Sequence, residues 1–125
     1  SGGESSRILL AFQTIFLQAN QVGTAIFDEV DTGISGEASN AVAKKIYEIS
    51  LSCQVLAITH APQVASFSDH AILIQKRTSN GRTSTHLHEL DLEEKIDAVA
   101  ALISSGKITQ KQREYAKEMI LQRES

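Results

Sequence analysis

The sequence predicts an α/β fold whose core is a parallel strand–helix–strand unit. Two short, continuous apolar runs, at residues 24–27 and 54–58, have the length and composition of buried strands in a parallel sheet. The segment between them shows apolar residues at helical spacing, and parallel strands need a crossover of that kind. In the second half, two runs that look like strands flank a turn and predict an antiparallel hairpin, followed by two helices.

The first predicted element is a helix over residues 5–20. Its helically spaced apolar residues are Ile8, Leu9, Phe12, Ile15 and Phe16. Leu10, Ala11 and Leu17 fill most of the remaining circumference, so we expect this helix to be buried on nearly every side. The pattern Ser1-x-x-Glu4 has the form of a capping box and predicts that the helix begins at the first residues.

The central unit follows. The strand at 24–27 ends in Asp28-Glu29, and residues 31–36 form a loop rich in turn formers. One face of the next helix is marked by Ala38, Val42, Ile46 and Ile49. The second strand, 54–58, ends at Thr59-His60, so two polar strand ends are expected to point the same way.

The hairpin is predicted from strands at 70–75 and 83–90 around a turn at 79–81. The first helix after it carries Ile96, Val99, Ala100 and Ile103 on one stripe and ends at Gly106. In the last helix, Thr109-x-x-Gln112 is a capping box, and Ala116, Met119 and Ile120 turn inward.

Three cations flank the predicted hairpin turn: Lys76, Arg77 and Arg82. Two interpretations of them stand side by side, a solvated tip and a weak contact with DNA.

Composition restricts the classes of function. The chain has 125 residues, 42% of them hydrophobic, and a net charge of −3, which does not suit a domain that holds nucleic acid by itself. Its single cysteine, Cys53, cannot form an internal disulfide, which fits a reducing cytoplasm. No apolar run approaches the ~20 residues of a membrane span, and no signal peptide is visible. The chain starts without a methionine, so we expect a segment cut from a longer protein.

The end of the first strand carries the strongest chemical signal. An apolar strand that ends in two adjacent carboxylates is the Walker B pattern of nucleotide hydrolases. Asp28 would hold Mg²⁺, and Glu29 would orient the attacking water. The alternative is an acidic pair that merely ends a strand.

Two further features accompany this pair. The glycines of Ser1-Gly2-Gly3-Glu4 would let a phosphate approach backbone N–H groups at a helix N-terminus. His60 stands at the end of the second strand. Each feature also has an ordinary interpretation, as a flexible helix start and as a histidine at the rim of a core.

In this order, the three motifs resemble the ABC-type ATPases, from the signature motif through Walker B and the D-loop region to the switch histidine. Glu4, in place of a glutamine, and Val30, in place of a proline, are typical of the SMC-like branch rather than of transporter domains. Within that branch, residues 1–7, 27–36 and 58–65 look like the RecN family of bacterial DNA repair ATPases. The run Asp-Glu-Val-Asp-Thr-Gly-Ile-Ser-Gly, 28–36, is the most specific part of the match.

The resemblance implies an ATPase that works as a pair of heads. The signature residues Ser1, Gly2, Gly3 and Glu4 would contact the ATP of the partner head, in trans. On the chain's own head, Asp28 would bind the metal, Glu29 would serve the water and His60 would sense the γ-phosphate. Either Asp31 or Ser35 would make the D-loop contact across the interface.

The phosphate loop G-x-x-x-x-G-K-[ST] does not occur in the 125 residues. We therefore expect residues 1–125 to be the C-terminal lobe of a head. Its partners would be the N-terminal half of the same protein, a second copy and, through the full-length assembly, DNA. The fragment would be inactive alone, and the protein would be cytoplasmic and associated with the nucleoid. The alternatives are the nucleotide-binding domain of a transporter and a non-catalytic dimerisation module.

Overall fold

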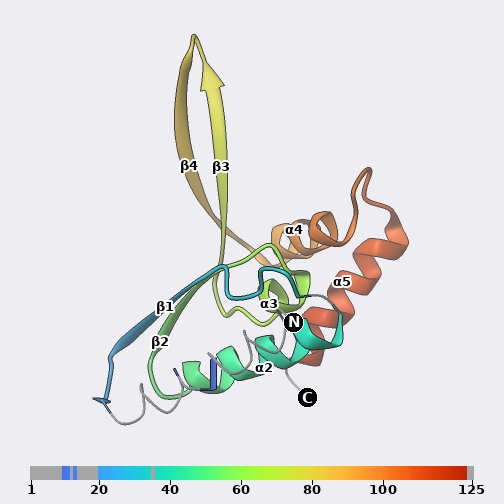
Figure 1. Ribbon diagram of the computed structural model, residues 1–125. Coiled ribbons are helices and arrows are strands. Elements are labelled where there is room, and N and C mark those ends of the chain that lie inside the picture. Colours follow the sequence, from blue (N-terminus) through green and yellow to red (C-terminus); the bar gives the residue numbers. More distant parts are fainter. Residues whose placement is uncertain (1–9, 12, 14–19, 35, 124–125) are drawn as a thin grey trace. The chain divides into compact units, whose positions relative to one another are not determined.

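The computed structural model describes residues 10, 11, 13, 20–34 and 36–123 (Figure 1). The chain divides into two compact units, Ser1–Phe67 and Ser68–Ser125. Of the predicted first helix, Leu10, Ala11, Gln13 and Asn20 are described and helical, and Leu10 is 3% exposed. The predicted capping box at Ser1 and Glu4 lies outside the described residues.

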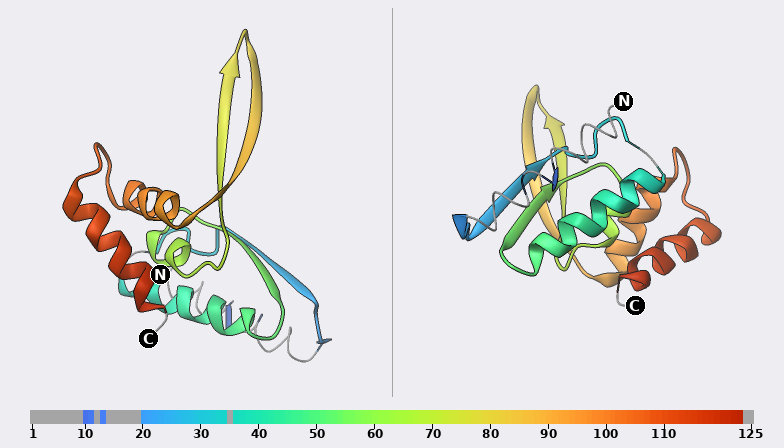
Figure 2. Two further views of the ribbon diagram at one scale, coloured as in Figure 1. Left: turned by 180° about the vertical axis from the view of Figure 1, so that it is seen from behind. Right: turned by 60° about the horizontal axis from the view of Figure 1, so that its bottom comes forward.

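The first unit contains the predicted strand–helix–strand core. Strand β1 (Thr24–Asp28) pairs in parallel with β2 (Gln54–Ile58), and helix α2 (Glu37–Ser50) connects them. Figure 2 shows α2 alongside the two strands. Gly36 precedes α2 with φ = 58°, a conformation that costs glycine little, so the loop can turn sharply into the helix. The predicted fold class is confirmed.

One face of the β1–β2 sheet packs into the core of this unit. The buried residues of this core are Leu10, Ala25, Phe27, Val42, Ala43, Ile46, Ile49 and Val64. Val64 comes from α3 (Pro62–Ser66), a helix of five residues that the sequence analysis does not predict. So short a helix shows no apolar period, although its proline at the first position is a typical start signal. The rings of Tyr47 and Phe67 meet edge to face at 6.0 Å.

The other face of the sheet is exposed, so the prediction of fully buried strands is wrong for this chain. Ile26, Leu56 and Ile58 are 69%, 48% and 44% exposed. The register pairs Ile26 with Leu56, and side chains alternate along a strand, so all three share one face. Their composition suits a covered sheet, but the described residues provide no second layer.

The second unit begins with the antiparallel hairpin of β3 (Ala71–Ser79) and β4 (Arg82–Leu90). The strands extend closer to the tip than predicted, because the loop contains only Asn80 and Gly81. Both have positive φ, 51° and 72°, which is the geometry of a two-residue turn that matches the strand twist. The residues near the tip are polar and show no apolar alternation, so the sequence pattern does not predict this pairing.

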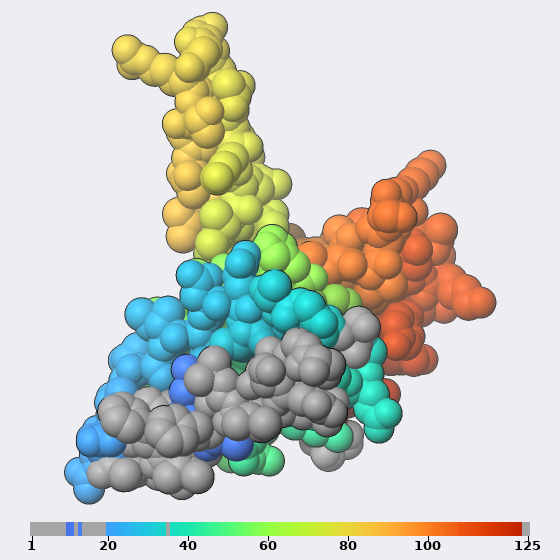
Figure 3. Space-filling view, in the orientation of Figure 1, coloured from blue at the N-terminus to red at the C-terminus, as the bar shows by residue number. Residues whose placement is uncertain are grey.

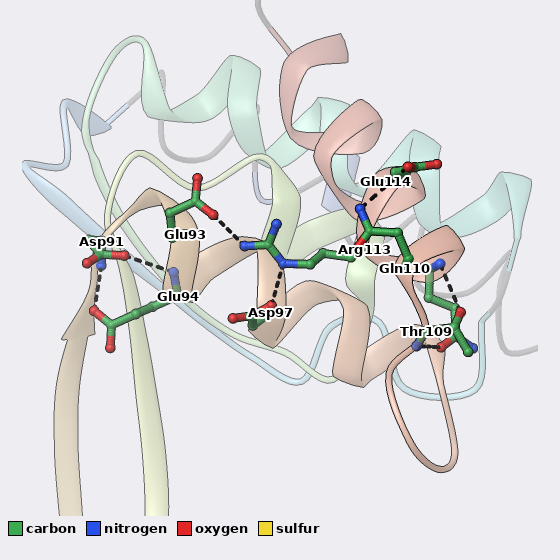
Figure 4. Close-up of polar contacts among 9 residues, drawn as sticks. Asp91, Glu93, Glu94, Asp97, Thr109, Gln110, Arg113 and Glu114 are labelled. Atoms are coloured by element: carbon green, nitrogen blue, oxygen red, sulfur yellow. Dashed lines mark hydrogen bonds and ion pairs between the residues drawn. The ribbon is translucent and has the colours of Figure 1, made fainter.

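Helices α4 (Leu92–Ile103) and α5 (Gln110–Gln122) complete the second unit. Both begin with a full capping box, Asp91 with Glu94 and Thr109 with Gln112 (Figure 4). All the predicted inward residues except the half-buried Ile103 are buried: Ile96, Val99, Ala100, Ala116, Met119 and Ile120. No helix in the described part of the chain is both long enough and apolar enough to cross a lipid bilayer.

Ion pairs join the two helices on their exposed side. The Arg113 guanidinium of α5 donates from Nε to Asp97 Oδ1 at 2.8 Å and also binds Glu93, both on α4 (Figure 4). Each carboxylate is largely exposed, so these bonds fix the register of the helices more than they add stability.

A buried cation holds the start of the second unit. Lys95 is 8% exposed, and its Nζ donates to the carbonyl oxygen of Ser68 at 2.6 Å. Arg123 Nη1 donates to the same oxygen at 2.9 Å, and Arg123 also binds Asp69. Burial lowers the pKa of the Lys95 ammonium, and the nearby Arg123 lowers it further.

The lowered pKa of Lys95 predicts that the free energy of unfolding depends on pH in the alkaline range. Between the lowered pKa and the unfolded value of 10.5, the unfolded state binds more protons, so the free energy of unfolding rises with pH. In Lys95→Met this alkaline rise should be smaller. The variant should be at least as stable as wild type at neutral pH, because Arg123 still satisfies the Ser68 carbonyl. Chemical denaturation across the alkaline range measures both effects.

Lys111→Met, at an exposed position of α5, is the matched control and should retain the wild-type slope. An unchanged slope in Lys95→Met would contradict the assignment.

Candidate functional site

The two polar strand ends lie side by side, as the sequence predicts. Asp28 pairs with Ile58 at the last position of the register, and the Glu29 N–H donates to the Ile58 carbonyl oxygen at 3.0 Å. Asp28, Glu29 and His60 therefore come to the same edge of the sheet. In a parallel sheet, this carboxyl edge is where ligands bind.

Glu29 has an unusual backbone conformation. Its φ is +55°, a region that residues with a Cβ rarely adopt and that is found disproportionately at functional sites. The bend turns its side chain toward the end of β2, where Glu29 Oε1 lies 3.4 Å from His60 Nε2. The two side chains are 53% and 83% exposed, so this contact faces solvent and is accessible to a ligand.

The Asp31 carboxylate connects the turn after β1 to the residues after β2. Asp31 is 8% exposed, and its Oδ2 accepts hydrogen bonds from Thr59 Oγ1 and from the Ala61 N–H, the latter at 3.0 Å. The Ala61 N–H also donates to Thr59 Oγ1 at 2.9 Å. These contacts hold both neighbours of His60, so the position of the imidazole depends on a buried carboxylate from the other strand's turn.

The edge combines three carboxylates with one imidazole. Asp28 and Glu29 are exposed, whereas Asp31 is buried and bonded. The two exposed carboxylates suit a cation and a polarised water. Within the described residues, no three potential ligands among His, Cys, Asp and Glu form a metal-binding group. A site here would use one or two carboxylates and leave the remaining positions to water and substrate, which is typical of Mg²⁺.

Some predicted site residues lie outside the described part of the chain: Ser1, Gly2, Gly3, Glu4 and Ser35. The partners of Asp31 were not predicted from the sequence. Thr59 and Ala61 are 28 and 30 residues away from it, and no local pattern marks a contact over that separation.

Sequence comparison finds DNA repair proteins. The chain is 46% identical to the DNA repair protein RecN of Halalkalibacterium halodurans over 96% of its length, and 43% identical to RecN of Bacillus subtilis over 98%. RecN of Vibrio cholerae is 41% identical over 97%. The chain spans only about a fifth of the length of these relatives. The resemblance to RecN is thus confirmed over nearly the whole chain.

Structural comparison finds a chain with a similar fold. The chain matches a chain from a study of ATP-driven dimerization and DNA-stimulated activation of SMC ATPases, with a TM-score of 0.66 and 22% identity. The match covers 86% of this chain and 64% of the other. No protein-family model matches the sequence.

The Asp31 contacts predict a stability difference between two substitutions. Asp31→Ala leaves the half-buried Ala61 N–H without its carboxylate acceptor and should lower the free energy of unfolding by about 1–3 kcal/mol. Asp31→Asn retains an oxygen that can accept the bond and should cost clearly less. Chemical denaturation compares the two variants with Thr32→Ala, an exposed neighbour. Equal losses for the alanine and asparagine variants would contradict the role of the carboxylate oxygen.

The left-handed backbone of Glu29 predicts that glycine affects stability differently at Glu29 and at the adjacent Asp28. Glu29→Gly removes a Cβ from a left-handed conformation and should leave stability unchanged or raise it by up to about 1 kcal/mol. Asp28→Gly, in the extended strand, should lower it by roughly 0.5–1 kcal/mol. Thermal or chemical unfolding tests the pair. A Glu29→Gly variant as destabilised as Asp28→Gly would show that the bend carries no strain.

Proposed function

We propose that this chain, which is related to the RecN DNA repair proteins over nearly its whole length, is the C-terminal lobe of an SMC-like, ABC-type ATPase head. The observation that carries the proposal is the carboxyl edge of the β1–β2 sheet. There, the Asp28–Glu29 pair ends one strand and His60 follows the other, with Glu29 Oε1 and His60 Nε2 3.4 Å apart. A carboxylate pair and a polar sensor at adjacent strand ends suit the hydrolysis of a nucleotide phosphate.

The lobe is incomplete as a catalyst. Its 125 residues contain no phosphate loop, so they lack the lysine and the backbone cradle that would bind the nucleotide. Parallel sheets are normally covered on both faces, whereas Ile26, Leu56 and Ile58 are exposed here. We propose that the N-terminal half of the same protein covers this face and supplies the phosphate loop.

The roles of the edge residues follow from their chemistry. An exposed carboxylate at Asp28 fits a Mg²⁺ site that is completed by water and phosphate oxygens, and the metal would neutralise charge on the phosphates. Glu29 accepts a proton from, and orients, the water that attacks the γ-phosphate. His60 donates a hydrogen bond to that phosphate. Contact between the two side chains couples water activation to phosphate sensing.

The remaining motif residues act across a pair of heads. We assign Ser1, Gly2, Gly3 and Glu4 to the signature motif, which would contact the nucleotide of the partner head. Because Oδ2 of Asp31 accepts two bonds within the chain, we favour Ser35 for the D-loop contact and assign Asp31 to positioning.

The whole protein would bind ATP between two heads and use its hydrolysis in the repair of DNA breaks in the bacterial cytoplasm, near the nucleoid. The names of the relatives support the repair role. The SMC ATPase study concerns dimerization driven by ATP and activation by DNA, which supports the paired-head mechanism.

The sharpest test is Glu29→Gln in the intact protein. The amide keeps the shape of the side chain but cannot accept a proton, so ATP turnover should fall by about 10²–10⁴-fold. ATP-dependent dimerisation should persist, because binding does not need the base. Steady-state turnover and analytical ultracentrifugation with and without ATP measure the two properties.

Glu37→Gln, an exposed glutamate at the start of α2, is the matched control and should hydrolyse normally. A Glu29→Gln protein with wild-type turnover would remove Glu29 from the mechanism. Turnover by the isolated 125-residue chain above that of its Glu29→Gln variant would contradict the claim that the lobe is inactive alone.

A further inference from the structure

The distal part of the β3–β4 hairpin is positively charged in an acidic chain. No aspartate or glutamate occurs from Ala71 to His88, although the chain as a whole carries a net charge of −3. The same segment contains Lys76, Arg77 and Arg82. The charge is therefore concentrated at one end of one element.

These three cations are exposed and form no ion pair within the described residues. The Arg77 side chain donates a hydrogen bond from Nη2 to Gln75 Oε1 at 3.3 Å, and Gln75 carries no charge. The other two arginines of the same unit differ, because Arg113 and Arg123 both bind carboxylates. No carboxylate in the described part of the chain therefore neutralises the positive charge of Lys76, Arg77 and Arg82.

The register distributes the charge over both faces of the ribbon. Lys76 lies opposite Thr85, whereas Arg77 lies opposite Ser84 and Arg82 opposite Ser79, on the alternate face. Hydroxyl groups therefore accompany each cation, and hydroxyls also bind phosphate oxygens. A polyanion could be contacted from either face.

The hairpin is shaped to reach such a partner. In Figures 1 and 3 it extends away from α4 and α5 of its own unit. A tight two-residue turn, Asn80 and Gly81, closes the tip, so no long loop separates the strands. The major groove of duplex DNA, about 12 Å wide, admits a two-stranded ribbon of this kind.

We propose that the distal end of the β3–β4 hairpin binds the phosphate backbone of duplex DNA through Lys76, Arg77 and Arg82. The proposal rests on the proposed function in DNA repair and adds to it a DNA contact within this lobe. Phosphates line both sides of a groove at short, regular spacing, which suits cations on both faces. The tip residues 78–81 carry no apolar side chain, so insertion into a bilayer is not favoured. None of the three side chains is assigned to base recognition.

The experiment compares two triple variants of the intact protein. One carries Lys76→Gln, Arg77→Gln and Arg82→Gln. The control carries Lys107→Gln, Lys111→Gln and Lys117→Gln, which are exposed, lie in the same unit and change the net charge equally. Fluorescence anisotropy measures binding to a labelled 30-base-pair duplex at salt concentrations from roughly 50 to 200 mM, the range over which phosphate contacts weaken steeply.

The hairpin variant should bind roughly tenfold more weakly, and its slope of log affinity against log salt should be less steep by about 2–3, since three phosphate contacts are lost. The control should match wild type. ATP turnover without DNA should be the same in all three proteins, which also shows that the hairpin variant is folded.

Equal affinity and slope for the two triple variants would overturn the hairpin contact while leaving the ATPase proposal intact. Equal loss in both would show a general effect of net charge and would also overturn it. A wild-type protein that hydrolyses ATP but does not bind the duplex would overturn the DNA contact, and one that does neither would overturn both proposals. Binding of polyglutamate, but not DNA, through the same three residues would assign the surface to an acidic polypeptide instead.

Discussion

The Asp31 carboxylate is the constraint on which the geometry of the site depends. Two parallel strands alone fix only their own backbones, and the segments that follow them are free to diverge. Asp31 removes that freedom, because one buried oxygen accepts hydrogen bonds from Thr59 and from the N–H of Ala61. A buried carboxylate needs hydrogen-bond donors, and Thr59 and Ala61 supply them. The same bonds hold the backbone on both sides of His60 in place. The consequence is that Glu29 and His60 meet at a distance set by the fold.

Backbone hydrogen bonds hold Glu29 in its strained conformation. A left-handed residue with a Cβ persists only where its surroundings determine it. Here the Glu29 N–H is bonded to Ile58, and its carbonyl oxygen accepts from the Thr32 N–H at 3.1 Å, so bonds on both sides define the bend. The exposed carboxylate is thereby aimed by groups that do not themselves face the ligand. Asp31 is buried and bonded within the chain, whereas Glu29, two residues earlier, is exposed.

The sequence predicted those parts of the structure that depend on local pattern. Val42, Ile46 and Ile49 repeat at helical spacing, and Thr109 and Gln112 form their capping box, because short-range geometry decides both. The prediction of a buried strand was wrong at Ile26. The apolar composition of a strand shows that it suits a covered sheet, but not whether this chain supplies the covering layer. The partners of Asp31 and the salt bridges of Arg113 could not be predicted. They join residues 16 to 30 positions apart, and many alternative pairings would satisfy the same charges.

The two units differ in what they need from elsewhere, and this difference bears on how such a head would work. In the second unit, both long helices begin with a capping box, and Lys95 and Arg123 converge on the carbonyl of Ser68. The first unit leaves Ile26, Leu56 and Ile58 on an open sheet face and leaves Glu29 and His60 exposed to solvent. A unit with its own capped helices can carry a projecting hairpin without any change at Glu29 and His60. In the proposed head, the edge with Glu29 and His60 would depend on the half that covers the open sheet, so assembly of the head would itself control when these two side chains act.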